Sequence, residues 1–451
     1  MSQTLQLILC LSILVFLHEL GHFLPARWFN TRVERFYLFF DSIFFFPVVN
    51  RFRFTLFKKK VGQTEFGLGW FPFGGYVNIV GMFGEPEEPE EIAAEAGVPD
   101  NEKFRNKKPW QRMIILAGGI TVNLILGYLL FVMILNVWGE DIQPIGNLKQ
   151  GIACDSLARA HGLRDGDKIL TVGGKTPETL DQAVLWMMLD NAEQLEVDRD
   201  GQKVAVSLPE DIEYKMVATN MKLVSPRMPF IIDSVMPRTV AHWGGLKKGD
   251  QVVRLNGDTI PYFHLWREKL VPLRKKVAVV GVIRDGSYRE FKLWVNESAT
   301  IGVYPKSSVG HYGLKHKAYS FGSSLGRGWE KTTERLVNYV KQFKLVFTKA
   351  GAKQIGGIAA IGSLFPEELN WQAFWTLTAT LSVILAFMNL LPIPVFDGGY
   401  MLFTLWEMVT RRKVPDKVMK HSLTVGMWIV LALFLYSNGN DLYRMVLSKY
   451  L

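Results

Sequence analysis

The chain has 451 residues, of which 49% are hydrophobic, so it is long enough for several domains and looks membrane-embedded rather than purely soluble. Its net charge of +10 does not indicate nucleic-acid binding, because the basic residues gather beside apolar segments, where they report orientation in a bilayer. The two cysteines, Cys10 and Cys154, are too few for a disulfide framework.

The first apolar segment, residues 5–24, contains the cluster His18-Glu19-Leu20-Gly21-His22 near its end. In a helix of 3.6 residues per turn, His18 and His22 lie about one turn apart on one face, so both imidazoles can bind one metal ion. Such a pair suits Zn²⁺, which keeps one position for water, and Glu19 would then be the general base. The pattern also arises by chance in helices. Ionisable groups in a membrane-length apolar segment are costly without partners, however, which favours metal binding.

Three further apolar segments, residues 113–138, 371–391 and 423–436, approach the length that crosses a membrane, which predicts four transmembrane helices. The first span has no basic leading region and no small-x-small cleavage site, so we interpret it as retained rather than as a signal peptide. Lys and Arg residues follow the first span, precede the second and separate the third from the fourth, which places these sides in the cytoplasm. Both termini and the long loop between spans two and three are expected outside.

The third span also runs towards the cytoplasm and ends near Asn389, after which Asp397, Gly398 and Gly399 follow. Asp397 therefore reaches the same side of the membrane as the histidine pair, and we expect it to be the third metal ligand. The alternative is that Asp397 caps a helix that begins near Tyr400. The shared depth of Asp397 and the histidines favours ligation.

Residues 66–84, between the first two spans, mix glycine with aromatic residues and predict a short membrane-associated β-hairpin. Non-helical backbone at membrane depth needs protein cover or a cavity, so we expect this hairpin against the metal site; the alternative is an interfacial aromatic loop. An edge strand at residues 77–80 would hold an unwound substrate by β-addition. The expected substrate-contacting residues here are Gly74, Gly75, Tyr76, Val77 and Asn78. The acidic segment 85–91 is expected to be a linker.

The long outside loop contains an internal repeat in which every match has the same offset of 83 positions. The matching residues are Ala158, Gly162-Leu163, Gly166-Asp167 and Gly174, which recur as Ala241, Gly245-Leu246, Gly249-Asp250 and Gly257. Each copy continues into an apolar strand, so the repeat predicts two small β-rich domains in tandem, in which Gly-Asp is structural. Residues 323–350 have apolar residues at helical spacing and predict an amphipathic helix that packs on the core.

With these residues assembled, the chain resembles the site-2 protease family of intramembrane zinc metalloproteases, and within it the RseP-type regulators of sigma-E protease. The resemblance covers nearly the whole length and rests on three motifs: His18-Glu19-x-x-His22, Asn389-x-x-Pro392-x-Pro394-x-x-Asp397-Gly398, and Phe73-Gly74-Gly75-Tyr76-Val77. It implies one Zn²⁺ held by His18, His22 and Asp397, with Glu19 as the base and Asn389 as a substrate contact. It also implies that the tandem outside domains are PDZ-like. Phe396 and Ile120 depart from the family's usual Leu and Pro, but neither is a ligand.

The resemblance further implies a multi-pass protein of the bacterial inner membrane, with the zinc site towards the cytoplasm and the PDZ-like domains in the periplasm. Its substrates would be single-pass membrane proteins already trimmed outside, such as an anti-sigma factor whose cleavage activates an envelope stress response, and remnant signal peptides. The residues alone predict only a metal-dependent hydrolase at the cytoplasmic side of a lipid bilayer. A non-catalytic, membrane-anchored PDZ adaptor is the alternative, and it would not need Glu19. An ion transporter would show ionisable groups along the full membrane depth, whereas Asn123 is the only strongly polar residue deep in span two.

The expected division of the chain follows from these segments. It is span one at 1–24, a cytoplasmic-side segment at 25–111 with the hairpin at 66–84, span two at 112–139, the two PDZ-like domains at 140–222 and 223–308, an amphipathic helix region at 309–370, span three at 371–399, a cytoplasmic loop at 400–421, and span four with the tail at 422–451.

Overall fold

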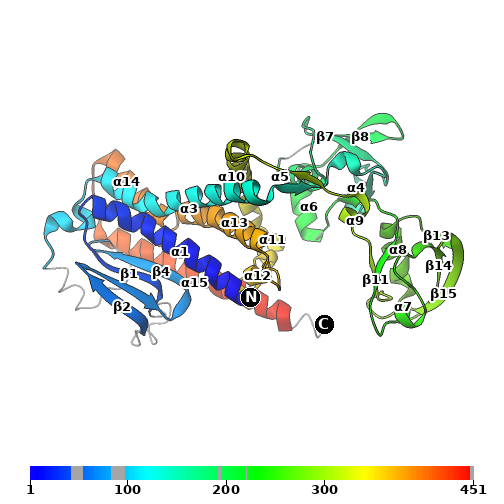
Figure 1. The fold of residues 1–451 in the computed structure, drawn as a ribbon. Coiled ribbons are helices and arrows are strands. Elements are labelled where there is room, and N and C mark those ends of the chain that lie inside the picture. Colours follow the sequence, from blue (N-terminus) through cyan, green and yellow to red (C-terminus); the bar gives the residue numbers. More distant parts are fainter. Residues whose placement is uncertain (42–53, 83–96, 191–193, 220, 447–451) are drawn as a thin grey trace. The chain divides into compact units, whose positions relative to one another are not determined.

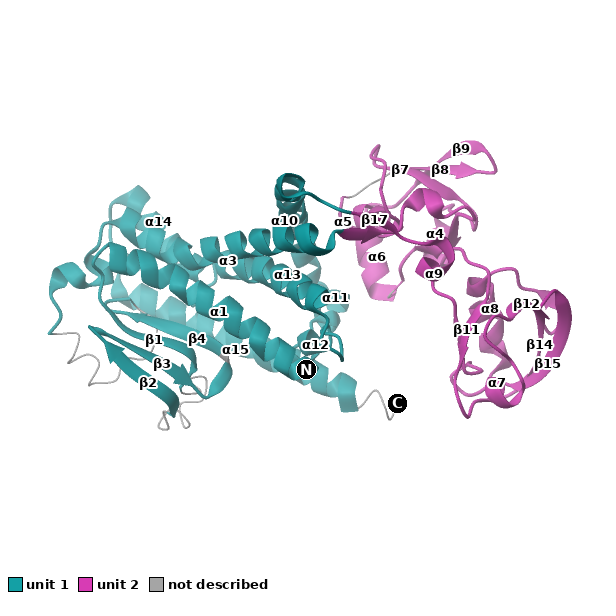
Figure 2. Ribbon diagram, in the orientation of Figure 1, with its two compact units in different colours: residues 1–139, 318–451 teal, residues 140–317 magenta. Residues whose placement is uncertain are grey.

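The computed structural model describes residues 1–41, 54–82, 97–190, 194–219 and 221–446. The chain forms two compact units, residues 1–139 together with 318–451, and residues 140–317 (Figure 2). The predicted acidic linker at 85–91 lies outside the described residues.

Unit 1 contains four helices that are long and apolar enough to cross a membrane, which confirms that part of the sequence prediction. They are α1 (Gln3–Trp28), α3 (Pro109–Trp138), α13 (Trp371–Leu390) and α15 (Asp416–Val446). The last helix is much longer than the apolar segment 423–436 from which it was predicted. The more polar part of α15 after residue 436 is held by tertiary contacts: the Asp441 carboxylate accepts from the Ala360 amide at 2.9 Å, and Asn438 accepts from the Ile358 amide at 3.3 Å.

Helix α3 is the centre of unit 1. It packs against α1, α13, α14 (Asp397–Thr410) and α10 (Phe321–Phe343), and Figure 1 shows it running alongside α1 and α13. The backbones of α1 and α3 nearly touch at Gly21 and Gly118, where a Cβ added to Gly21 would lie 2.6 Å from the Gly118 carbonyl oxygen. The sequence therefore needs glycine at this crossing, and the close approach brings α3 against the histidine pair of α1.

A four-stranded sheet packs against α1 and replaces the predicted hairpin at 66–84 (Figure 1). Its strands are β1 (Val33–Phe40), β2 (Thr55–Val61), β3 (Thr64–Gly69) and β4 (Phe71–Ile79), in the order β2-β3-β1-β4. The hairpin prediction was wrong because β1 lies between β3 and β4, parallel to the former and antiparallel to the latter. A strand that comes from outside the segment cannot be found from the segment's own pattern. The predicted edge position of residues 77–79 is nevertheless present, since β4 ends the sheet.

The outer part of unit 1 also differs in detail from the sequence prediction. The predicted helix at 323–350 is α10, which ends at Phe343 and is followed by η5 (Lys344–Phe347), α11 (Lys349–Gln354) and α12 (Ile358–Gly362). Small residues rather than large ones form the buried face of α10, and Gly328 meets Val132 of α3. Trp329 is 61% exposed, so the prediction that the large apolar side chains of this helix pack on the core was only partly right. Two short 3-10 turns, η1 (Asp100–Glu102) and η2 (Phe104–Asn106), precede α3.

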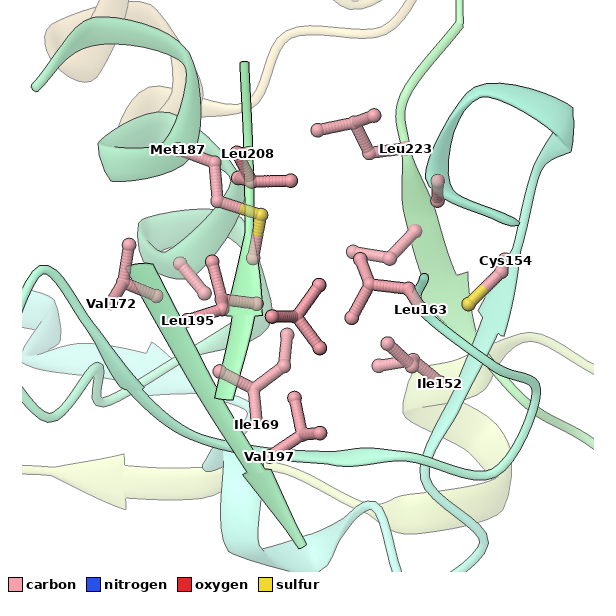
Figure 3. Packing of buried hydrophobic residues seen from close by; sticks show 14 of the residues in the cluster. Ile152, Cys154, Leu163, Ile169, Val172, Met187, Leu195, Val197, Leu208 and Leu223 are labelled. Atoms are coloured by element: carbon pink, nitrogen blue, oxygen red, sulfur yellow. The ribbon is translucent and has the colours of Figure 1, made fainter. Parts of the chain in front are cut away.

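Unit 2 contains two hydrophobic cores, one for each copy of the repeat. The first is built by β6 (Ile152–Cys154), α4 (Ser156–Ala160), β7 (Lys168–Val172), α5 (Leu180–Leu189), β8 (Gln194–Arg199), β9 (Gln202–Ser207), α6 (Ile212–Thr219) and β10 (Val224–Pro226). Figure 3 shows side chains of both its sheets, such as Ile152 and Leu195, pointing into this core. Cys154 is also buried in it and free.

The second core is built by β11 (Ile232–Val235), α7 (Val240–Trp243), β12 (Gln251–Leu255), β13 (Asp258–Thr259), α8 (Phe263–Leu270), η4 (Val271–Leu273), β14 (Val277–Arg284), β15 (Ser287–Trp294) and β16 (Val303–Pro305). The unit is completed by η3 (Ile145–Asn147), α9 (Ser308–Tyr312) and the paired strands β5 (Glu140–Ile142) and β17 (Lys315–Lys317). Strands β7 and β12 follow directly after the two Gly-Asp pairs of the repeat. Both copies therefore place the same turn before the same kind of strand.

Candidate metal centre

The three side chains that the sequence predicted as ligands lie together in unit 1. His18 and His22 occupy adjacent turns of α1, and Asp397 is the first residue of α14. The two Nε2 atoms are 3.3 Å apart, His18 Nε2 lies 3.3 Å from Asp397 Oδ2, and His22 Nε2 lies 3.4 Å from Asp397 Oδ1. Within the described residues, this is the group of three that could hold a metal ion.

These atoms fit a zinc ion. Tetrahedral ligation with bonds of about 2.1 Å separates neighbouring ligand atoms by roughly 3.4 Å, as is seen between these three side chains. Asp397 Oδ2 is buried and receives no hydrogen bond from any described group, so it has an unused lone pair directed at the histidines. Asp397 does not cap α14, because the N-cap position is Phe396 and no side chain caps this helix.

Both imidazoles are oriented from behind by α3. His22 Nδ1 lies 2.8 Å from the Ile115 carbonyl oxygen, which requires the proton on Nδ1 and leaves Nε2 free for a metal. His18 Nδ1 lies 3.0 Å from the amide nitrogen of Asn123, whose own Oδ1 has no partner in the described structure. With the amide N and O of Asn123 exchanged, Oδ1 accepts a hydrogen bond from His18 Nδ1. Oδ1 then has a partner, and the proton on Nδ1 leaves His18 Nε2 free for a metal. The sequence showed Asn123 as an isolated polar residue in an apolar span, but not this contact.

A glycine makes room for the two imidazoles. A Cβ added to Gly119 would lie 2.5 Å from His22 Nε2 and 2.6 Å from His18 Cε1, so no larger residue fits without displacing the histidines. Gly119 was not among the residues predicted from the sequence to shape the site. The adjacent pair Gly118-Gly119 in an otherwise apolar helix was the available signal, since glycine inside a helix usually has a packing reason.

The turn between α13 and α14 carries backbone strain that positions Asp397. Val395 has φ of +95°, a conformation that is unusual for a β-branched residue. Just beyond it, a Cβ added to Gly399 would lie 2.5 Å from the Ile393 carbonyl oxygen. The tight, strained turn lets α14 start within reach of α1, so its first residue can meet the histidines.

The remaining predicted site residues line one cavity of about 580 Å³ together with the three candidate ligands. Glu19 is half-buried there, and the backbone amide of Val77 interacts with its carboxylate. Asn389, near the end of α13, has its amide nitrogen 3.2 Å from His18 Nε2. The other lining residues from the prediction are Gly74, Gly75, Tyr76, Val77 and Asn78 of β4. The structure therefore brings a carboxylate, a three-ligand cluster and a strand edge to one cavity.

Comparison with known proteins identifies a family whose chemistry agrees with this site. The profile of peptidase family M50 matches residues 6–433. The chain belongs to peptidase family M50. This confirms the resemblance to the site-2 proteases and supports a zinc metalloprotease.

Relatives match over nearly their whole length. A protein of Campylobacter jejuni named as a zinc metalloprotease is 26% identical over 445 residues, which are 97% of this chain and 93% of the relative. The regulator of sigma-E protease RseP of Escherichia coli is 24% identical over 97% of this chain and 98% of its own length. The regulator of sigma E protease of Haemophilus influenzae is also 24% identical, with the same coverage. Together with the four apolar helices, these relatives indicate a membrane-embedded protease of the bacterial inner membrane.

Proposed function

We propose that this M50 protease hydrolyses a peptide bond inside a transmembrane segment, with His18, His22 and Asp397 holding one Zn²⁺ and Glu19 acting as the base. The observation that carries the proposal is the placement of Glu19. It shares one cavity with the three ligands and with a strand edge, in a unit built of membrane-length helices. A soluble peptidase would not need to form such a cavity between apolar helices.

Zn²⁺ in this site would supply an acidified water and polarise the scissile carbonyl. Glu19 takes the proton from the attacking water and passes it to the leaving amine. The Asn389 amide beside His18 is placed to donate to the substrate backbone. The cavity lies between α1, α3 and β4, where apolar side chains surround these polar groups and lower the effective dielectric constant below that of bulk water.

The outer edge of β4, which pairs with no other strand among the described residues, gives the substrate a place to bind in extended form. The Val80 amide donates inward to the Arg32 carbonyl, whereas the Val77 amide faces Glu19. Because successive amides of a strand alternate, those of Gly75, Val77 and Ile79 point away from β1. A helical substrate that unwinds could pair with this edge and present its peptide bond beside Glu19.

We further propose that unit 2 consists of two PDZ-like domains in the periplasm and that it excludes substrates with bulky outside domains. The competing role is capture of a C-terminal carboxylate by the repeat turns. Those amides are already engaged: Leu163 donates to the Ala158 carbonyl at 3.1 Å and Leu246 to the Ala241 carbonyl at 3.0 Å, and both preceding glycine amides also have backbone acceptors. The turns therefore have little to offer a carboxylate, which favours the filter.

The proposed substrates are single-pass membrane proteins that have been trimmed outside, of the anti-sigma-factor type, whose cleavage would activate an envelope stress response. Remnant signal peptides are proposed as a second class. Support for the first class comes from the names of the Escherichia coli and Haemophilus influenzae relatives, which describe regulators of sigma E. The cytoplasmic placement of the zinc site rests on the distribution of Lys and Arg around the spans.

The test is cleavage of a single-pass substrate by the purified, reconstituted protein. We expect cleavage to stop with chelator and to fall about 10² to 10⁴-fold in Glu19→Gln, because the amide keeps the shape but cannot accept a proton. Glu368→Gln, at an exposed position of the same unit, is the matched control and should cleave normally. Without chelator, zinc content should be equal in the wild-type protein, Glu19→Gln and Glu368→Gln.

A non-catalytic adaptor predicts a different result. Wild-type protein would then leave every substrate intact, while both variants would bind membrane partners as well as wild type does. Normal cleavage by Glu19→Gln would instead show that another group is the base.

A further inference from the structure

The strand β2 forms the edge of the sheet opposite to β4 (Figure 1). Apolar residues and lysines occupy different parts of this strand. Its first half and the preceding residue carry apolar side chains, Phe54, Leu56 and Phe57, which are each about 60% exposed. Its second half is the consecutive run Lys58, Lys59 and Lys60, also exposed, followed by the exposed terminal residue Val61. The active-site cavity does not include β2.

The register of the sheet assigns these two halves to different depths along α1. Strand β1 runs back along α1 from its C-terminal end, because the Thr31 amide binds the Ala26 carbonyl and Phe36 packs against both Phe23 and Phe16. The far end of β1 reaches the middle of α1, where Gly75, the partner of Leu38, faces Val15. The start of β1 is therefore shallow in the membrane and its end is deep.

The lysines pair with the shallow end and the apolar residues with the deep end. Strand β3 is parallel to β1, with Glu65 opposite Arg35 and Leu68 opposite Leu38. Strand β2 runs antiparallel to β3, so Lys60 lies opposite Glu65 and Phe57 lies opposite Leu68. At a rise of about 3.3 Å per residue, Leu56 and Lys59 are about 10 Å apart along the strand, which is comparable to the distance between headgroups and acyl chains.

We propose that β2 is a binding surface for anionic phospholipids, with Phe54, Leu56 and Phe57 among the acyl chains and Lys58, Lys59 and Lys60 at the phosphates. The Lys58 ammonium is 3.9 Å from Glu65, a separation too long for strong pairing, and its side chain is 61% exposed. Long lysine side chains that leave an apolar environment extend towards the headgroups, so the run can meet several phosphates at once.

Protection of an exposed edge from pairing with other strands is a simpler role for lysines. It explains the charges but not the exposed phenylalanines and leucine beside them, which would promote the association that the lysines prevent. A lipid surface satisfies both halves of the strand. The bound lipids would hold the sheet, and with it the β4 edge, at a fixed depth. The inference rests on the proposed immersion of this sheet, but its test does not involve cleavage.

The test compares retention of phosphatidylglycerol and phosphatidylcholine with identical acyl chains by the purified full-length protein, measured by native mass spectrometry. Each lysine near an anionic surface contributes about 1 kcal/mol, or roughly fivefold in affinity. We therefore expect K58Q/K59Q/K60Q to lower phosphatidylglycerol affinity by at least about tenfold and to leave phosphatidylcholine retention unchanged. K203Q/K276Q/K292Q removes three exposed lysines from unit 2 and should behave as wild type.

K58R/K59R/K60R keeps the charge and should keep the lipid preference. Zinc content reports whether the sheet and site remain folded. If the glutamine variant loses zinc, the test is made with the arginine variant alone. Loss of the lipid preference in the arginine variant overturns the proposal. Equal retention of the two lipids by wild type also overturns it. So does an undiminished preference in K58Q/K59Q/K60Q.

Discussion

Two carboxylates with little exposure to solvent, one in each unit, have opposite hydrogen-bond environments. In unit 2, Asp250 Oδ1 accepts from Arg284 Nε at 2.6 Å, and Oδ2 accepts from Arg284 Nη2 and from the Lys247 amide. In unit 1, Asp397 meets two imidazole nitrogens, and its Oδ2 has no hydrogen-bond donor in the described structure. A carboxylate whose lone pairs are filled by protein donors holds a fold together. One left short of donors is available to a ligand.

Both copies of the repeat contain the same aspartate–arginine pair, so this pair is a structural element of the repeat. Asp167 binds Arg199 and the Arg164 amide as Asp250 binds Arg284 and the Lys247 amide. Each arginine also donates to the carbonyl of the repeat's first glycine, Gly162 or Gly245. The Gly-Asp pair therefore joins a turn to a strand, and the site chemistry resides elsewhere.

The largest difference between the two carboxylates should appear on removal of each. Asp397→Ala leaves two imidazoles, so we expect zinc affinity to fall by more than about 100-fold and cleavage to vanish. Asp250→Ala should keep stoichiometric zinc. Metal analysis of both purified proteins checks this, and stoichiometric zinc in Asp397→Ala would assign the third ligand to another residue.

The stability of unit 2 should fall in Asp250→Ala and stay unchanged in Asp397→Ala. Asp250→Ala removes the charge-assisted hydrogen bonds of the half-buried Arg284, which typically costs about 1.5 to 3 kcal/mol of unfolding free energy. Hydrogen exchange at β12 and β14 of the full chain measures the loss. The paired change Asp250→Leu with Arg284→Met should recover much of it, because it leaves no unpaired charge. Unchanged protection in Asp250→Ala would show that the ion pair adds nothing.

A smaller effect on the metal centre should follow from filling the space beside it. Gly119→Ala places a methyl group against His18 and His22, and we expect zinc affinity to fall about 10- to 100-fold, as for other changes behind metal ligands. Gly322→Ala is the matched control, since a Cβ at that helical position meets nothing within 4 Å. Zinc competition with a chelator gives both affinities. Equal affinities would mean that α3 shifts freely to accommodate the methyl group.

The smallest expected effect is a pH dependence confined to acid. Burial alone would raise the pKa of Asp250, but Arg284 and the Lys247 amide outweigh it and hold that pKa below its usual value. The ionised Asp250 therefore contributes its full stabilisation of unit 2 above the pKa of about 4 that it has in the unfolded chain. This contribution is lost as the pH falls through the lower pKa of the folded state. Protection of β12 against exchange, corrected for intrinsic rates, should be constant from pH 7 to 5 and decline below about 4. A decline already at pH 6 would implicate another group.

The sequence predicted the features that depend on local pattern or on membrane sidedness. The meeting of Asp397 with the histidine pair followed from Lys and Arg flanking the spans, because charge fixes which helix ends share a depth. Strands β7 and β12 followed from turns with glycines at positive φ, such as Gly166 and Gly249, which give a local signal.

Features made by distant segments were not predictable in the same way. Strand β1 enters between β3 and β4 from outside the segment that was analysed, so the hairpin prediction failed. The contacts of Asn123 and Gly119 with the imidazoles depend on how α3 is rotated, which the weak periodicity of an apolar helix does not specify. The strain at Val395 is likewise a product of the closed turn, not of its residue types.

The order of the three candidate ligands along the chain has a consequence for the cell that makes the protein. His18 and His22 leave the ribosome at the start of synthesis, and Asp397 only near its end, with all of unit 2 in between. At about 5 to 20 residues per second, the histidine pair waits roughly 20 to 80 s for its third partner. Throughout that time the growing chain lies in a membrane full of nascent transmembrane helices. With the proposed ligand set, the metal site of this peptidase is incomplete until unit 2 has been made.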